Sequence, residues 1–590
     1  MKVTKDFIDI SSPHRKWMWI LVIIFVTISV FRITSTYHLF NATYDENQHL
    51  LSGVELFDRG SYLYGPDHPP LARIAVALGP YLAGTRLSNQ QRAYLTDWEQ
   101  NRAAMEEYEE YSGSISRWHV GTELLHAGQD YFRTLSLARL GILPFFVLTL
   151  AITWVWGRAI LGDSVAFLSM LLLSTLPSVL GHGGLATTDM VLTCCFLIGV
   201  ISFSLWLKTP NVFFGSLFGA TWGLAALSKF SALLFLPSCA AMIIFWRYLF
   251  TRSSVDKTPQ RHRTIRKRLS TLFLAGLVAF LVVWAGYSFS LSPLGSRGMR
   301  PYGHIDKILG ASGTIHNLAY AAVETPVPLG KFVLGVNMQK KHNDKGHMAY
   351  LLGNYSLKGW WYYFPIVFAI KTPFPFLLLV VVGFITLGRL ALLNKDWRLL
   401  VPILCAVTIM LVVIPAKINI GSRYILPIFP FLALIAGYGA VFLWRLKTRT
   451  IATRCAVIIL LGWHVVSTTL AHPDYLAYFN EIASNSPERF VVDSDLDWGQ
   501  DLYRLSVELK KRDIDELALA YFGSEDPKYF GLPLFRILEP YETTTGWVAI
   551  SMTKLMDVFG NQHDGYAWLQ KYKPVAIIGK SIKLYYVPTK

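Results

Sequence analysis

The stretch from Phe374 to Leu387 reads FPFLLLVVVGFITL and contains no charged side chain. Runs of similar character occupy Trp17 to Val30 and Leu272 to Ala285. A helix needs roughly 20 apolar residues to cross a bilayer core about 30 Å thick. The chain as a whole is 53% hydrophobic and 16% charged, which is too apolar for an ordinary soluble protein. The sequence therefore predicts an integral membrane protein that crosses the bilayer many times.

Hydropathy along the chain predicts a mainly α fold, a polytopic transmembrane helical bundle of about eleven spans. The predicted spans are residues 17–36, 134–157, 163–182, 190–207, 211–227, 231–249, 270–291, 373–391, 399–415, 424–443 and 455–471. Residues 71–87 are apolar enough to resemble a span, but they are short and contain Arg73 and Pro80, so we expect a helix at the membrane interface. All five cysteines lie in apolar runs and are predicted to be packing residues.

The basic residues predict which face of the membrane is cytoplasmic. Lys and Arg gather before the first span and in the loops at 247–268, 389–398 and 445–454, and all four places lie on one side of the predicted spans. Short cytoplasmic loops carry an excess of Lys and Arg, so this side is expected to be cytoplasmic. The same bias accounts for the net charge of +16 without nucleic acid as a partner. The N-terminus is then inside, and the C-terminal region is outside.

The predicted spans divide the chain into two domains. Residues 1–471 form the transmembrane domain, which has long extracytoplasmic loops at 37–133 and 292–372, and the first loop is acidic around Glu106 to Glu110. Residues 472–590 are predicted to form a small soluble α/β domain, also extracytoplasmic. Its expected elements are a helix at 501–513 and strands at 516–522, 546–551, 575–578 and 582–587.

Charged and ionisable side chains gather on the outer face of this topology. Charges near membrane depth are costly, so each is a candidate functional residue. The acidic candidates are Asp45, Glu46, Asp67 and Asp189, and the basic ones are His68, Arg73, Lys229, Lys371 and Arg423. Transfer of a sugar from a lipid phosphate needs a carboxylate to deprotonate the acceptor hydroxyl. It also needs cations to hold the phosphate as it leaves. The mixture on this face suits that chemistry.

The roles expected from these residues have simpler alternatives. Asp45 is the predicted base, Asp189 is expected to position the acceptor or a metal, and Lys229, Lys371 and Arg423 are expected to hold phosphate. Asp45 and Glu46 could instead cap a helix N-terminus, and His68 could be an ordinary loop histidine. The three basic residues could be anchors that extend from helix ends toward the interface.

The acidic segment Asp493-Ser-Asp-Leu-Asp-Trp-Gly499 is similar in composition to a calcium loop. Its glycine falls at position seven rather than six, and Arg504 stands at position twelve in place of Glu. These departures exclude an EF-hand. A turn that caps the helix beginning near Asp501 is the better interpretation.

The quoted residues resemble a known family when they are read as motifs. Tyr44-Asp-Glu46, Asp67-His-Pro-Pro-Leu-Ala-Arg73, Thr188-Asp189, Lys371-Thr-Pro373 and Arg423-Tyr-Ile-Leu-Pro427 are similar to motifs of the C-type (GT-C) membrane glycosyltransferases. The resemblance covers roughly residues 17–445 and is strongest to the family 39 group, which includes the protein O-mannosyltransferases and the aminoarabinose transferases that modify lipid A. The segment from Asp493 to Asp501 resembles one found in bacterial proteins of this kind, without an assigned role.

The resemblance implies the reaction and the parts that perform it. It implies a polyprenyl- or dolichyl-phosphate sugar donor and an inverting displacement without a glycosyl-enzyme intermediate. It also implies a catalytic acid in the first outer loop, matched by Asp45 with Glu46 beside it, and a second acid matched by Asp189. His68 stands where aminoarabinose transferases have a lysine before proline, so Arg73 could supply that phosphate contact. Metal use varies among these relatives.

The sequence therefore predicts a glycosyltransferase of the bacterial inner membrane, with its active site on the periplasmic side. The acceptor stays open among a glycolipid, a polysaccharide and a protein. A divalent metal also stays open, because Asp45, Asp67 and His68 could form a partial site. The alternatives are a transporter or lipid flippase, which intramembrane charges also mark, and a non-catalytic assembly factor. Transporters are typically built from repeated halves, and the sequence contains no internal repeat.

Overall fold

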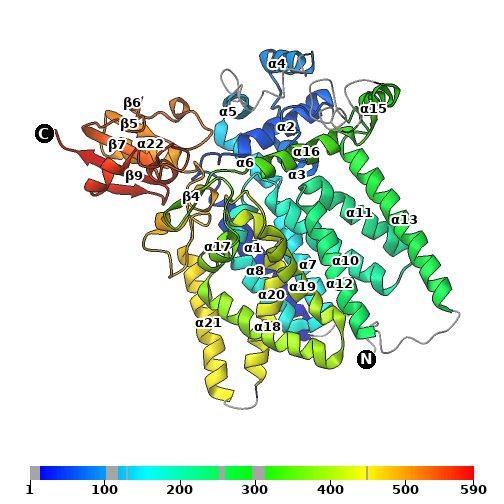
Figure 1. Ribbon diagram of the computed structural model, residues 1–590. Helices are drawn as coiled ribbons and strands as arrows, with labels where there is room; N and C mark the ends of the chain where they lie inside the picture. The colour runs from blue at the N-terminus through cyan, green and yellow to red at the C-terminus, as the bar shows by residue number, and fades with distance from the viewer. Residues whose placement is uncertain are drawn as a thin grey trace.

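The computed structural model shows a bundle of long helices with shorter helices at its upper end and a small β-sheet at the upper left (Figure 1). The described residues are 13–100, 117–127, 130–251, 260–294, 308, 313–446 and 450–589. The acidic stretch at 106–110 and the basic loop residues at 252–259 lie outside them.

All the segments that were predicted to be spans are helical in the structure. The helices of the bundle are α1 (Pro13–Thr34), α6 (Tyr131–Leu140), α7 (Leu143–Leu161), α8 (Asp163–Thr175), α9 (Pro177–Gly183), α10 (Asp189–Lys208), α11 (Val212–Ser228), α12 (Ala232–Thr251), α13 (Gln260–Gly286), α18 (Phe374–Asn394), α19 (Trp397–Val413), α20 (Phe429–Arg445) and α21 (Thr450–Leu470). Among the described residues, eight helical segments are long and apolar enough to cross a membrane, and the bent pair α8–α9 makes a ninth. The remaining two of the eleven expected spans, α11 and α19, are apolar helices of 17 residues each, at the short end of the length that crosses a bilayer.

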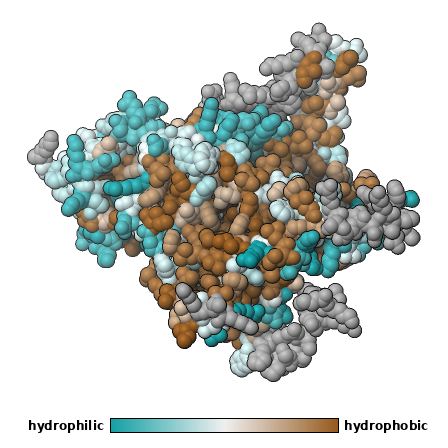
Figure 2. Space-filling model, turned by 60° about the horizontal axis from the view of Figure 1, so that its bottom comes forward, coloured by the Kyte–Doolittle hydropathy of each residue, from teal (hydrophilic) through white to brown (hydrophobic). Residues whose placement is uncertain are grey.

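The outer surface of the bundle is apolar, as a lipid-facing surface must be. Phe31, Phe273 and Ile385 are 71%, 76% and 64% exposed. Figure 2 shows hydrophobic residues covering much of the bundle, whereas hydrophilic residues cover the region of the sheet. Four of the five cysteines are buried, but Cys455 is exposed on α21. The predicted packing role therefore fails for Cys455, because an apolar run also supplies the side that faces lipid.

Close helix packing in the bundle depends on small residues. A Cβ atom on Gly383 of α18 would lie 1.9 Å from the carbonyl oxygen of Ile435 on α20. On α11, a Cβ on Gly219 would lie 2.2 Å from the carbonyl oxygen of Ala275 on α13. Helices in a membrane gain little from the hydrophobic effect and associate through such close backbone contacts.

Shorter helices and strands form the outer layer that carries the site. They are α2 (Glu46–Arg59), α3 (Pro70–Leu82), α4 (Asn89–Gln100), α5 (Arg117–His126), α15 (Thr314–Glu324), α16 (Gly330–Lys345) and α17 (Tyr363–Lys371), with the strand pairs β1 (Leu291–Ser292) with β2 (Val327–Pro328) and β3 (Ala349–Leu351) with β4 (Asn354–Ser356). Helix α3 is the apolar segment that was predicted to lie at the interface. Its 13 residues span about 20 Å, too short to cross a bilayer, and it packs against α2, α6 and α11.

The C-terminal region contains the predicted α/β elements and one more strand. They are α22 (Leu502–Lys511), α23 (Met552–Leu555), β5 (Glu516–Ala520), β6 (Leu534–Ile537), β7 (Gly546–Ser551), β8 (Ala576–Ile578) and β9 (Ile582–Val587). The sheet order is β6-β5-β7-β9-β8, with β5 parallel to both β6 and β7 and the other pairs antiparallel. Strand β6 escaped prediction because it is a mostly exposed edge strand without an apolar alternation.

Helix α18 offers a test of the glycine contacts. We expect Gly383→Ala to lower the apparent melting temperature of the purified protein, because its Cβ meets backbone atoms of α20 and overpacking costs about 1–3 kcal/mol. Gly388→Ala on the same helix is the matched control, since its Cβ would meet only the Ile403 side chain at 3.7 Å. Equal melting temperatures for the two variants would contradict this packing.

Candidate active site

Asp45 and Arg423 form an ion pair where the segment between α1 and α2 meets the bundle. The Oδ2 atom of Asp45 lies 2.5 Å from Nη1 of Arg423, and the two side chains are 15% and 10% exposed. Asp45 precedes α2 at its N-cap position, but its carboxylate makes no capping hydrogen bond. The helix-cap alternative therefore does not describe this side chain. Arg423 reaches Asp45 from the 3₁₀ helix Ser422–Ile428, which leads into α20.

Asp189 and Lys229 form a second ion pair, in which Asp189 Oδ1 lies 2.6 Å from Lys229 Nζ. Asp189 is the first residue of α10, where a helix N-terminus favours a negative charge. Lys229 directly follows α11. The ammonium group also lies 4.6 Å from the ring centre of Tyr424, next to Arg423. The interpretation of Lys229 and Arg423 as anchors that reach toward the interface does not fit, because both are buried and paired.

The two ion pairs belong to one electrostatic cluster. Arg423 interacts electrostatically with Asp189 as well as with Asp45, and His68 interacts with both Lys229 and Asp45. Several buried polar atoms around the cluster have no hydrogen-bond partner among the described residues. They are Gln48 Oε1, His68 Nδ1, His182 Nδ1, Asp189 Oδ2, Arg423 Nε and Asp495 Oδ2. Buried polar atoms are nearly always paired in folded proteins, so such a group of unpaired donors and acceptors suits a polar ligand.

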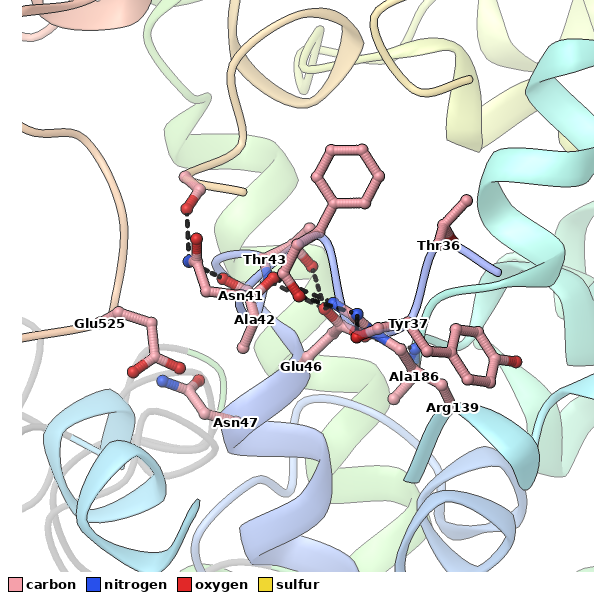
Figure 3. A network of polar contacts seen from close by, with 12 residues as sticks. Thr36, Tyr37, Asn41, Ala42, Thr43, Glu46, Asn47, Arg139, Ala186 and Glu525 are labelled. Carbon is pink, nitrogen blue, oxygen red and sulfur yellow. Dashed lines mark hydrogen bonds and ion pairs between the residues drawn. The ribbon is translucent and has the colours of Figure 1, made fainter. Parts of the chain in front are cut away.

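Glu46, although adjacent to Asp45 in the sequence, points toward Arg139 and Ala186 (Figure 3). Its carboxylate accepts hydrogen bonds from Arg139 Nε and Nη2 at 2.9 and 2.8 Å, from the Ala186 N–H at 2.8 Å and from the Thr43 N–H at 2.8 Å. Burial would raise the pKa of Glu46, but Arg139 and the backbone donors outweigh burial and lower it. The Glu46 carboxylate is therefore ionised and fully bonded within the protein.

Arg73, on α3, is also occupied, by α2 and by the loop between α2 and α3. It is completely buried and donates from Nε to His49 Nδ1 at 3.1 Å and from Nη1 to the Tyr62 hydroxyl at 2.9 Å. Its Nη1 also donates to the Gly65 carbonyl, and its Nη2 lies 3.5 Å from Asp67. The guanidinium group thus holds the loop that precedes α3.

His68 lies close to the cluster as a neutral ring. Burial lowers its pKa to about 3 against the opposing effect of Asp67, so the ring carries no charge at neutral pH. Asp67 itself pairs with Arg117 at 2.9 Å. Among the described residues, no three His, Cys, Asp or Glu side chains gather as metal ligands, and the partial metal site of Asp45, Asp67 and His68 is not formed.

Lys371 contacts the C-terminal region rather than the two ion pairs. Its Nζ donates to the carbonyl oxygens of Asp495 at 2.5 Å and Leu476 at 2.6 Å, and it lies 4.2 Å from the ring centre of Phe479. Burial lowers the pKa of Lys371 to about 8, partly offset by Asp495. Nothing in the sequence near Lys371 indicated these carbonyl partners, which come from beyond the last span.

The structure adds three residues that were not predicted. Trp498 stacks on Arg423, with 4.3 Å between the guanidinium carbon and the ring centre. His182 of α9 lies edge-to-face against Trp498 at 6.4 Å and interacts electrostatically with Asp189 and Arg423. Burial raises the pKa of Asp493 to about 7, although Arg423 opposes the shift, so this carboxyl exchanges its proton near neutral pH. The acidic motif at 493–501 was the only signal for two of them.

Solved structures resemble this chain over most of its length at low sequence identity. ArnT from Cupriavidus metallidurans in the apo state is 13% identical, with a TM-score of 0.46, and the match covers 98% of this chain and 100% of that chain. The archaeal oligosaccharyltransferase AglB from Archaeoglobus fulgidus, in complex with an inhibitory peptide and a dolichol-phosphate, is 10% identical with a TM-score of 0.46, covering 95% and 73%. No protein-family model and no curated protein matches the sequence.

The Glu46–Arg139 pair should stabilise the fold. Both side chains are almost completely buried, and removing one partner of such a pair costs about 3–5 kcal/mol because the other charge stays uncompensated. We expect Glu46→Gln to lower the melting temperature of the purified protein strongly. Asp45→Asn is the control and should lower it much less, because the Asp45 side chain is 15% exposed whereas that of Glu46 is fully buried.

Acid should weaken the same pair. Because the pKa of Glu46 is lowered in the folded state, its contribution is complete above its ordinary value of 4.5 and is lost as the pH falls through the lowered value. The difference in melting temperature between wild type and Glu46→Gln should therefore shrink below about pH 4.5. A difference that stays constant into acid would contradict this assignment.

Proposed function

We propose that this protein transfers a sugar from a polyprenyl-phosphate donor to an acceptor hydroxyl on the extracytoplasmic face, with inversion, and that Asp45 is the base. The observation that carries the proposal is the pairing of two carboxylates with two cations in one partly accessible cluster. A base and a phosphate site are the two parts that the reaction needs. Both come from separate parts of the chain and converge at the ends of α2, α10, α11 and the 3₁₀ helix before α20.

The cations are placed to hold the phosphate of the donor. Arg423 uses Nη1 for Asp45, and its Nε is a buried donor without a partner, so the planar group can still bind a phosphate oxygen. Lys229 adds a second charge beside the Tyr424 ring. Together they would stabilise the negative charge that grows on the phosphate as it leaves.

In the proposed reaction, phosphate competes with Asp45 for Arg423 and so releases the carboxylate. The acceptor oxygen attacks the anomeric carbon, its proton passes to Asp45, and the bond from the anomeric carbon to the phosphate oxygen breaks. The lipid phosphate leaves with that electron pair. Asp189, with an unpaired Oδ2, orients hydroxyl groups of the sugar or of the acceptor.

Three of the residues expected in the site take other roles in this proposal. Glu46, Arg73 and Lys371 each bond several protein groups, so in this proposal each positions a neighbouring segment instead of contacting the substrate. His68 is neutral and contributes at most a hydrogen bond to the phosphate.

The proposed orientation rests on the basic ends of the helices. Arg389 and Lys395 near the end of α18, Arg398 of α19 and Arg445 of α20 are the basic residues that the positive-inside bias places in the cytoplasm. In Figure 1 these helix ends lie at the bottom and the sheet lies at the upper end of the bundle. The cluster at the start of α2 is then extracytoplasmic, in a bacterial inner membrane.

Loss of the base should abolish transfer. We expect Asp45→Asn to lower the release of polyprenyl phosphate from polyprenyl-phosphate sugars by about 10²-fold or more, with purified protein in liposomes. Asp58→Asn is the matched control, because Asp58 lies on the same helix and also pairs with an arginine, Arg92, at 2.9 Å. Undiminished turnover in Asp45→Asn would end the assignment of the base.

Arg423 should matter chiefly for the donor. We expect Arg423→Lys to raise the KM for the donor by about tenfold, since lysine keeps the charge but loses the two-pronged contact with phosphate. Arg398→Lys serves as the control, because its pair with Asp396 lies in an exposed turn at the basic end of the bundle. An unchanged donor KM in Arg423→Lys would remove Arg423 from the phosphate site.

A further inference from the structure

The acidic segment Asp493 to Asp501 contacts both sides of the Asp45–Arg423 pair. The carbonyl oxygen of Trp498 accepts a hydrogen bond from the Tyr44 N–H at 3.0 Å, next to Asp45. Asp495 Oδ1 accepts from the Ser422 N–H at 2.9 Å and from the Ser422 hydroxyl at 2.7 Å, next to Arg423. The segment therefore joins the two parts of the chain that carry Asp45 and Arg423, which lie 378 positions apart.

The ring of Trp498 determines the space that Arg423 can occupy. The guanidinium group lies between the carboxylate of Asp45 at one edge and the indole face, 4.3 Å from the ring centre. Trp498 is 2% exposed and ranks among the largest fully buried side chains, so the ring has little freedom to move. A cation over an indole face is stabilised more strongly when both are withdrawn from water. The contact thus restrains an otherwise flexible arginine in one orientation.

The C-terminal region fixes the segment from the other side. Asp497 Oδ2 accepts from the Thr553 N–H of α23 at 2.8 Å, and Asp501 Oδ2 accepts from the Ser581 hydroxyl between β8 and β9 at 2.7 Å. The Tyr521 hydroxyl, just after β5, donates to the Gly499 carbonyl at 2.6 Å. Three residues of the C-terminal region therefore hold the segment from Asp493 to Asp501. Within this segment, Asp495 contacts Ser422 and Trp498 contacts Arg423.

Lys371 completes this arrangement from the bundle side. Its ammonium group, at the end of α17, donates to the Asp495 carbonyl and keeps that residue against Ser422. Gly421, with φ +139°, has room for no side chain here, because a Cβ atom would lie 2.1 Å from Ser494 Oγ. The backbone on both sides of the contact is therefore closely fitted.

We propose that Trp498 and Asp495 are positioning residues of the donor-phosphate site, and that residues 472–590 belong to the catalytic unit. Trp498 holds the plane of the Arg423 guanidinium, and Asp495 holds the backbone at Ser422 from which Arg423 extends. Neither residue contacts the reacting atoms. This inference rests on the proposed function, because it assigns the phosphate contact to Arg423.

The test measures binding of undecaprenyl phosphate to the purified full-length protein in a double-mutant cycle. Trp498→Leu should raise the apparent Kd by about tenfold, and Trp498→Phe, which keeps an aromatic face, should stay within about threefold of wild type. In an Arg423→Gln background the Trp498→Leu change should add less than about twofold, because Trp498 acts through Arg423. Asp495→Ala should weaken binding, and Asp495→Asn, which keeps the accepting oxygen, should restore most of it.

Trp154→Leu is the matched control for loss of a buried indole. Trp154 is equally buried, but it packs in the bundle on α7 against Trp19. We expect Trp154→Leu to lower the melting temperature without changing the Kd. Equal losses of affinity in Trp498→Leu and Trp154→Leu, or an undiminished effect of Trp498→Leu beside Arg423→Gln, would overturn the inference alone. Failure of the wild-type protein to bind undecaprenyl phosphate would overturn the proposed function and the inference together.

Discussion

One buried carboxylate, Glu46, connects the elements on which the site depends. It bonds Arg139 on α6, the backbone at Ala186 shortly before α10, and Thr43 in its own loop. These bonds fix the loop that carries Asp45 relative to the start of α10, which carries Asp189, in the protein without substrate. Because a buried charge without a partner is so unfavourable, the three segments must meet in this register. The position of the catalytic candidates follows from that constraint.

The paired state of the charges explains how the cluster can exist near membrane depth. Asp45 and Asp189 each have a cation within hydrogen-bonding distance, so neither of these two carboxylates is an isolated charge. In the proposed reaction, a phosphate that binds Arg423 would replace one anion by another and leave the Asp45 carboxylate available as a base. Binding of the phosphate and release of the Asp45 carboxylate would then be one exchange of the ion-pair partner of Arg423.

The C-terminal region also contacts the residues beside the Asp45–Arg423 pair. Its segment from Asp493 to Asp501 contacts Tyr44 and Ser422 at the bundle. Thr553, Ser581 and Tyr521 hold this segment from the side of the sheet. The hydrophobic core of the bundle continues into this region, since Leu496 and Ile550 belong to the same buried cluster as the span residues. Residue 471 was predicted to be a domain boundary, and the buried packing is continuous across that position.

The sequence by itself determined the membrane class, the helical nature of every predicted span and most strands of the C-terminal sheet, because apolar length and periodicity are local properties. It also pointed to Asp45, Asp189, Lys229 and Arg423. Only the tertiary structure shows that residues of like chemistry have different partners, such as Asp45 and Glu46 or Lys229 and Lys371. Each of these side chains takes its role from a partner far away in the chain, such as Arg139 for Glu46 or Asp495 for Lys371. Such pairings are set by how helices pack against one another, and no local pattern in the sequence records them.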